Sequence, residues 1–62
     1  MKRFSFERAV KDELKKQLFS RGMVEVTMDD ALMTHLAREL VSMNEYGWDN
    51  QKLVTWFVKR LD

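Results

Sequence analysis

The stretch of sequence that decides the fold is TMDDALMTHLARELVSMNEY, residues 27–46. With about 100° between successive residues, its apolar side chains spread over well more than a third of a helix circumference. An ordinary surface helix has a narrower apolar stripe, so a helix of this kind needs neighbours on two sides. We therefore expect it to be the central element of a small bundle. The apolar arc consists of Leu32, Met33, Leu36, Ala37, Leu40, Val41 and Met43.

Local signals mark the start and the end of this helix. Thr27 is followed by Asp30 three residues later, which fits the capping pattern S/T-x-x-D/E before an apolar run. The pattern predicts that Thr27 caps the helix and that Asp30 is its third residue. We expect the helix to continue to Glu45 or Tyr46, after which Gly47 supplies a left-handed residue.

A first helix is predicted from about Phe6 to Ser20. Apolar residues recur there at every fourth position and form a single stripe. Ser5 is a suitable N-cap, and Gly22 is expected to end the helix in the left-handed conformation. The stripe consists of Phe6, Val10, Leu14 and Leu18.

A third helix is predicted after Gly47. Asp49 or Asn50 supplies its N-cap, and the helix is expected to run to the C-terminus. Its apolar stripe is narrower than the arc of residues 27–46. This stripe consists of Leu53, Val54, Phe57, Val58 and Leu61.

The segment between the first two helices, residues 23–27, alternates in polarity and contains two β-branched valines. This pattern favours an extended chain. The segment is either a linker whose valines pin it to the core, which we favour, or a strand that pairs with its symmetry mate in a dimer. The predicted fold is all-α: a small three-helix bundle with a short extended segment, in a single domain spanning residues 1–62.

The chain is short for a self-sufficient core. A domain of 62 residues buries only about 60 % of the surface that its unfolded chain exposes, so disulfides, a metal or a partner subunit commonly add stability. The sequence contains no cysteine, and its single histidine, His35, cannot form a zinc site alone. Association of two copies is the remaining common route, so we expect a homodimer.

Charges are divided unevenly along the chain. Residues 1–21 hold seven of the eleven Lys and Arg residues against three acids, whereas residues 22–62 hold four against seven acids. This division suits self-association through opposite charges, or a modestly anionic partner. No run approaches the roughly 18 apolar residues of a membrane span, and no signal-peptide pattern is present. We therefore expect a cytoplasmic protein with no membrane partner.

The sequence offers little for catalysis. Its two glycines lie 25 residues apart, which excludes a glycine-rich phosphate loop, and no serine has a nucleophile motif. Asp29 and Asp30 are explained by their place at a helix start, where the helix dipole favours carboxylates. His35 is expected to be solvated or hydrogen-bonded. We therefore predict a non-enzymatic protein without a cofactor, a bound metal or a small-molecule substrate.

Trp56 is the residue most informative about function. It lies on the third predicted helix, roughly opposite the apolar stripe and among cations, and Trp48 projects toward the same side. Because tryptophan is enriched at binding hot spots, we predict a surface that binds a protein partner or a second copy. Two alternatives are that Trp56 covers an edge of the core beneath lysine stems, or that it stacks on a nucleic-acid base. The predicted surface comprises Trp48, Lys52, Trp56 and Lys59, with Phe19 as an extension.

A small regulator that binds nucleic acid is the alternative function. Arg8, Lys11 and Lys15 form a basic line along the first predicted helix. Cations of this kind bind phosphates, and the binding weakens steeply with salt because each contact releases counterions. The prediction is therefore a salt-sensitive complex with DNA or RNA.

From Val24 onward, the order of elements resembles the ribbon–helix–helix family of dimeric DNA-binding proteins. The shared order is an extended segment, a capped helix, a glycine turn and a second helix. In that family, paired strands enter the major groove and their outward side chains read bases. The resemblance implies that Met23, Glu25 and Thr27 are the outward-facing positions.

Overall fold

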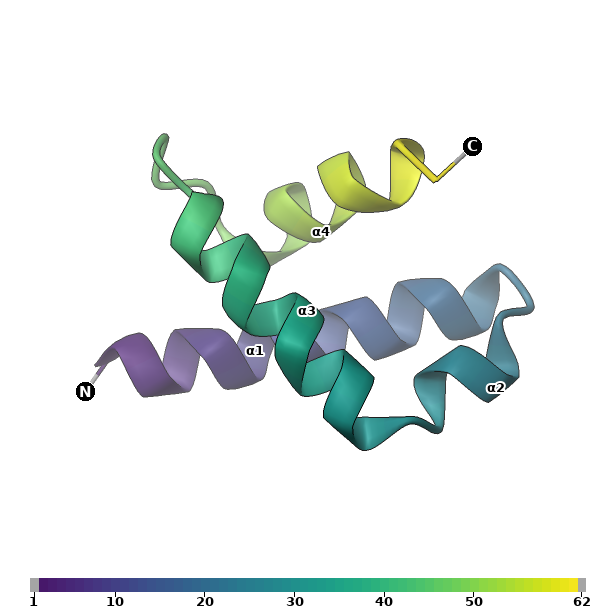
Figure 1. Cartoon of the computed structure of the whole chain (residues 1–62). Coiled ribbons are helices and arrows are strands. Elements are labelled where there is room, and N and C mark those ends of the chain that lie inside the picture. The colour runs from purple at the N-terminus through teal and green to yellow at the C-terminus, as the bar shows by residue number, and fades with distance from the viewer. Residues whose placement is uncertain (1, 62) are drawn as a thin grey trace.

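The structure is a computed structural model that describes residues 2–61, with side chains from Ser5 onward. The described residues form four helices and no strand: α1 (Lys2–Ser20), α2 (Val24–Thr27), α3 (Asp30–Met43) and α4 (Asn50–Lys59). Figure 1 shows α3 crossing in front of α1, α4 running above α1, and α2 between α1 and α3. The all-α class is confirmed. The prediction of three helices is not, because a one-turn helix replaces the extended segment.

The core lies around α1, which packs against both α3 and α4, whereas α3 and α4 touch each other much less. Val10 and Leu14 are fully buried, and Leu18 is almost so. The central helix is therefore α1, and the prediction that residues 27–46 form it is wrong. The remaining core residues are Met33, Ala37 and Leu40 from α3, and Leu53, Val54 and Val58 from α4.

The α3 helix buries only part of its wide apolar arc. Leu32 is 37 % exposed and Met43 is 54 % exposed, while Leu36 and Val41 are half-buried. The rest of the arc packs on the core, so a single side of the helix is covered. The width of the arc therefore does not make α3 central, and it leaves an apolar face on the outside of the molecule.

The chain leaves α1 through a tight C-terminal motif. Gly22 has a φ of 87°, and its N–H donates to the Phe19 carbonyl at 2.9 Å. The Met23 N–H donates to the Leu18 carbonyl at 3.0 Å. These two bonds are those of a Schellman motif, and they confirm that Gly22 ends the helix in the left-handed conformation.

Residues 23–27 do not form the predicted extended segment. Val24–Thr27 make a single helical turn, in which the Thr27 hydroxyl donates to the Val24 carbonyl at 2.7 Å. The Met28 N–H also donates to the Val24 carbonyl, at 3.2 Å. Because these bonds close within a few residues, the local turn prevails over the β propensity of the two valines. The extended conformation that both alternatives, linker and strand, required is therefore wrong, although Val26 packs against the core as the linker interpretation expected.

Asp29 caps α3 in place of Thr27. The Asp29 carboxylate accepts a hydrogen bond from the Leu32 N–H at 3.1 Å. Thr27 does not take this role because its hydroxyl is bonded within α2. Asp30 is therefore the first residue of α3 and not the third.

The end of α3 also differs from the prediction. The helix stops at Met43, before Glu45 and Tyr46, and Asn44 is its C-cap. Gly47 has a φ of 70°, so it is left-handed as predicted, but it lies within the loop that follows the helix. The Asn44 side chain forms two hydrogen bonds with the backbone of Trp48, and these hold the chain in a loop directly after Met43.

The predictions for the caps of α1 and α4 and for the end of α4 are correct in part. Ser5 does not cap α1, because the helix already begins at Lys2. Asp49 is confirmed as the cap of α4, since its carboxylate accepts from the Lys52 N–H at 2.8 Å. The predicted continuation of α4 to the C-terminus is wrong, because the helix ends at Lys59 with Arg60 as its C-cap and Leu61 lies in a turn; Asp62 is outside the described residues.

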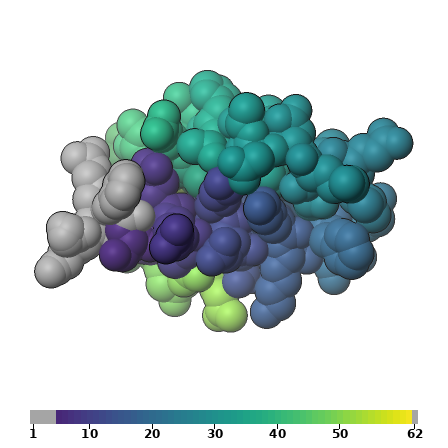
Figure 2. Space-filling model, turned by 90° about the horizontal axis from the view of Figure 1, so that it is seen from below, coloured from purple at the N-terminus to yellow at the C-terminus, as the bar shows by residue number. Residues whose placement is uncertain are grey.

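Seen from below, α1 and α3 lie against each other along the molecule, and α2 with the turn after it projects at one end (Figure 2). The principal extents are 30 × 22 × 14 Å. Within residues 2–61, none of the helices combines the length and the apolar character that crossing a membrane requires.

Candidate interaction site

The loop between α3 and α4 is held in place by its own side chains. Asn44 makes two hydrogen bonds with Trp48: its Nδ2 donates to the Trp48 carbonyl and its Oδ1 accepts from the Trp48 N–H, both at 2.9 Å. Gly47 allows the left-handed turn between them. Asp49 then caps α4. The loop therefore holds Tyr46 and Trp48 in defined positions beside the start of α4.

Three aromatic rings meet at this loop, and we call Tyr46, Trp48 and Trp56 the aromatic cluster. The Tyr46 and Trp48 rings stack with centroids 5.5 Å apart, and Trp56 meets Trp48 edge-on at 6.3 Å. Tyr46 is 80 % exposed. The two indoles are half-buried and pack against the core. The cluster thus covers an edge of the core and at the same time presents aromatic surface to solvent.

Two cations lie against the indoles. The Lys52 Nζ is 5.2 Å from the Trp48 ring centroid, and the Arg60 guanidinium carbon is 5.0 Å from that of Trp56. At exposed sites such cation–π contacts contribute about 0.5–1 kcal/mol each. They keep positive charge at the edge of the aromatic cluster, where it can face an anionic group.

The aromatic cluster borders two open hollows. One, of about 460 Å³, is lined by all four residues predicted for the core of the binding surface: Trp48, Lys52, Trp56 and Lys59. The other, of about 300 Å³, lies on the side of α3 and joins the cluster to the exposed Met43. The structure therefore brings the four predicted residues together and extends their surface onto the end of α3.

Phe19 is not part of this surface. It is 60 % exposed near the end of α1. The start of α4 lies beside the middle of α1, where the Asn50 Nδ2 donates to the Ala9 carbonyl at 3.4 Å. Further along, the Gln17 Nε2 donates to the Thr55 Oγ1 at 3.0 Å, and Phe19, two residues after Gln17, projects about 160° away from it around α1. No ring contact among the described residues joins it to the aromatic cluster.

Two residues of the surface, Tyr46 and Arg60, were not predicted from the sequence. Tyr46 was expected to end a helix, and Arg60 was not assigned to the surface. The sequence contains a signal for Tyr46, because it directly precedes the turn residue Gly47 and therefore lies in a loop that can expose its ring. Arg60 lies four residues after Trp56, a spacing at which helical side chains meet.

The basic line of α1 is partly neutralised. The Lys11 Nζ lies 2.7 Å from the Asp30 carboxylate, and the Lys15 Nζ lies 3.6 Å from it. The hydrogen bond from Lys11 is the main cause that lowers the pKa of Asp30 below its ordinary value of 3.8. Arg8 is exposed. The line therefore presents less positive charge than its three cations suggest.

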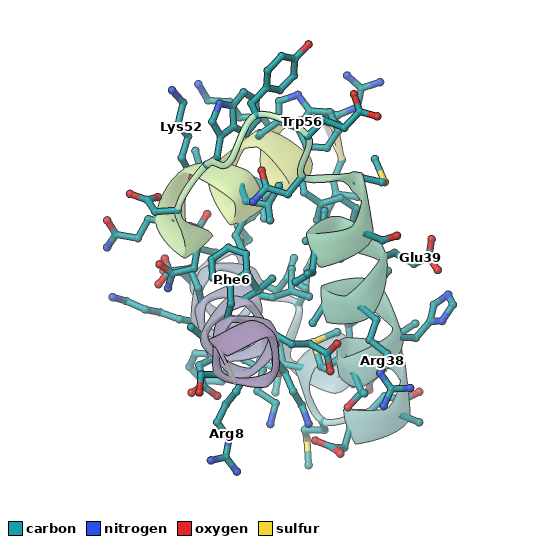
Figure 3. The ribbon with its side chains drawn as sticks, turned by 90° about the vertical axis from the view of Figure 1, so that its left-hand side faces the viewer. Phe6, Arg8, Arg38, Glu39, Lys52 and Trp56 are labelled. Atoms are coloured by element: carbon teal, nitrogen blue, oxygen red, sulfur yellow. The ribbon has the colours of Figure 1, made fainter. Side chains whose placement is uncertain are left out.

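A groove of about 340 Å³ between α1 and α3 includes Arg8 and Lys11 and adds Arg38 from α3. Arg38 in turn pairs with Glu7, with 3.4 Å between Nε and Oε1. Figure 3 shows Arg8 and Arg38 at the end of this view opposite Lys52 and Trp56. The two predicted binding surfaces are therefore separate.

Comparison with known proteins does not assign the chain to a family. A scan against family models, a search of curated proteins and a search of solved structures each found no match. The resemblance to the ribbon–helix–helix family required a strand before α3. Residues 24–27 are helical, so the paired-strand reading element that the resemblance implied is not formed by the described residues.

Proposed function

We propose that the chain is a non-enzymatic interaction module that self-associates and binds through the aromatic cluster and the cations around it. The observation that carries this proposal is Tyr46, which is 80 % exposed although it stacks on a half-buried tryptophan. Fully burying a large apolar side chain contributes about 1.5–3 kcal/mol. An interface that covers Tyr46 would therefore gain most of that contribution, which the isolated chain lacks.

The local geometry supports binding for a second reason. Tyr, Trp and Arg are the residue types that dominate binding hot spots, and Tyr46, Trp48, Trp56 and Arg60 supply all three. Packing on the core already restricts the two indoles, and the hydrogen bonds of Asn44 fix the backbone of Trp48. Little side-chain freedom remains to be lost on association, which favours affinity.

Sedimentation equilibrium combined with tryptophan emission tests this proposal. We expect the mass to rise with concentration, and the emission to shift to shorter wavelength as the indoles lose contact with water. Tyr46→Ala should weaken association at least about tenfold, which is about 1.4 kcal/mol. Phe19→Ala is the matched control, since it removes an exposed aromatic ring elsewhere and should have no effect.

A wild-type chain that stays monomeric up to about 1 mM would contradict self-association, because the remaining attraction would be weaker than about 4 kcal/mol. Equal effects of Tyr46→Ala and Phe19→Ala would contradict the assignment to the aromatic cluster. The two results separate the existence of an interface from its location.

Nucleic-acid binding is the second candidate, and the groove with Arg8, Lys11 and Arg38 favours it. Glu7 and Asp30 oppose it, because they neutralise cations on both sides of the groove. An electrophoretic shift assay at low salt tests it. Retarded DNA or RNA whose binding weakens steeply with salt would support this candidate, and unshifted nucleic acid would remove it.

A further inference from the structure

One face of α3, apolar except for Glu39, borders the core at Leu36 and is otherwise exposed. Four residues, Leu32, Leu36, Glu39 and Met43, fall within about 60° of one another around the helix. Leu32 and Met43 are 37 % and 54 % exposed, and Leu36 is half-buried. Figure 3 shows Glu39 pointing away from α1 and α4. We call these four residues the outer face of α3.

The outer face of α3 is symmetric along the helix. Leu36 and Glu39 lie at equal distances from its midpoint, and so do Leu32 and Met43. If a second α3 packs against it in the opposite direction around a two-fold axis at that midpoint, Leu32 of each copy meets Met43 of the other. Leu36 of each copy then lies opposite Glu39, which is exposed at the edge of the face furthest from the core. A two-fold interface requires such self-complementarity, because the same patch serves both partners.

The exposed side chains beyond the two ends of α3 also match under this symmetry. Before α3 lies Met28, which is 78 % exposed; after it lies Tyr46, which is 80 % exposed. Figure 1 shows the segments that carry them at opposite ends of α3. The antiparallel arrangement places Met28 of one copy against the aromatic cluster of the other, where a thioether makes favourable contacts with rings.

Charges at the two ends of α3 are complementary. Residues 22–37 contain no Lys or Arg, and Glu25 and Asp29 lie exposed beside Met28. At the other end, the three cations Lys52, Lys59 and Arg60 surround the aromatic cluster and outnumber the two acids beside it, Glu45 and the α4 cap Asp49. Antiparallel packing brings the acids of each copy to the cations of the other, whereas parallel packing brings like charges together. Complementary charges steer association and fix its register.

We infer that a second copy of the chain covers the outer face of α3, with the two α3 helices antiparallel and Met28 of each copy on the aromatic cluster of the other. This inference rests on the self-association proposed above and names the opposing surface. It also explains why the apolar arc of α3 is wide. One side of the arc packs on the core, and the second copy packs on the other.

Disulfide cross-linking of full-length variants tests the inference, because the natural chain contains no cysteine to interfere. We expect a mixture of Leu32→Cys and Met43→Cys chains to form a cross-linked dimer under mild oxidation. Each variant alone should not, since its two copies of the same position are then about 16 Å apart along the helices. A disulfide needs Cα atoms no more than about 7 Å apart. Phe19→Cys is the control for random collision and should cross-link at background level.

A charge exchange gives an independent measurement at two exposed positions, and circular dichroism of each variant confirms that it folds, since Lys52→Glu also removes the contact of Lys52 with the Trp48 ring. Glu25→Lys alone and Lys52→Glu alone should each weaken dimerisation severalfold. A chain with both substitutions should recover most of the affinity, because opposite charges then face each other again with their positions exchanged. Lys16→Glu, an exposed reversal on α1, is the matched control and should leave the dimer unchanged.

The possible outcomes separate this inference from the proposed function. Cross-linking of Leu32→Cys with itself would indicate parallel helices and would overturn the inference, while leaving self-association intact. A dimer that forms without any α3 cross-link, and that Tyr46→Ala disrupts, would also overturn it and retain the aromatic cluster as the interface. A wild-type chain that is monomeric in sedimentation would overturn both.

Discussion

The substitution Leu14→Ala tests whether α1 is the centre of the fold. Leu14 is fully buried, midway along the stripe of the helix that contacts both α3 and α4. Truncating a buried leucine to alanine removes apolar contacts and leaves a cavity, at a cost of about 2–5 kcal/mol. We expect the free energy of unfolding to fall by at least about 3 kcal/mol. Both α3 and α4 pack on α1, so neither helix can move in to fill the cavity without losing its own contacts.

That loss is large for this chain. At about 0.05–0.15 kcal/mol per residue, a domain of this length has a free energy of unfolding of about 3–9 kcal/mol. The Leu14→Ala variant should therefore lose a third or more of its stability, and at the lower limit it should be unfolded. Leu32→Ala, on the outer face of α3, should cost less than about 1 kcal/mol in the monomer, because its side chain is already 37 % exposed.

Urea denaturation followed by far-ultraviolet circular dichroism measures both values. The protein must be dilute, since association would add stability to the folded state and mask the difference. If Leu32→Ala proved as costly as Leu14→Ala, α3 would be enclosed on two sides within one chain. The assignment of α1 as the central helix, and with it the exposed outer face of α3, would then be refuted.

Three further predictions concern single positions. Asp29→Ala should destabilise the chain by about 1 kcal/mol through loss of the α3 cap, and Thr27→Ala by less, as measured by thermal unfolding; the reverse order would restore Thr27 as the cap. Gly22→Ala should cost about 1–2 kcal/mol in the same assay from its left-handed backbone alone, since an added Cβ meets no atom within 4 Å. Because the pKa of Asp30 is lowered, mainly by Lys11, its contribution to stability is present above pH 3.8 and is lost as the pH falls below that value through the lowered pKa. The pH dependence of the melting temperature should therefore flatten there in Asp30→Asn, and an unchanged acid profile would contradict the role of this ion pair.

The features that were correctly predicted from the sequence depend on short-range interactions. Val10, Leu14 and Leu18 recur every fourth residue, and that spacing alone places them on one helix face. Gly22 and Asp49 act on backbone groups within a few residues, so their roles were visible in the sequence. Such signals do not depend on what packs against them.

The features that were not predicted depend on competition or on tertiary packing. Thr27 and Asp29 are both capping residue types two positions apart, and only the one-turn helix α2, which engages the Thr27 hydroxyl, decides between them. The width of the α3 arc states how much apolar surface exists but not whether another helix of the same chain covers it. The central helix was therefore assigned wrongly, although the helix itself was found.

The candidate surface was predicted in part for a similar reason. Trp48, Lys52, Trp56 and Lys59 were identified from helical spacing, and they line one hollow. Phe19 was included because it lies off its own stripe, but spacing within α1 does not show where α4 crosses it. Tyr46 was missed because its exposure depends on the loop at residues 44–48. Hydrogen bonds between the Asn44 side chain and the Trp48 backbone hold this loop.

The two interpretations of Trp56, as cover for the core and as a contact residue, are compatible. A half-buried indole is held by the core on one side, so it binds a partner on the other side without losing much freedom. For the same reason Trp56→Ala would lower stability and affinity together, and a loss of binding could not be attributed to the interface. Tyr46 stacks on the Trp48 ring and is 80 % exposed, so its removal should alter association with little effect on unfolding. The decisive substitution is therefore at Tyr46, although tryptophan is the residue that first points to this surface.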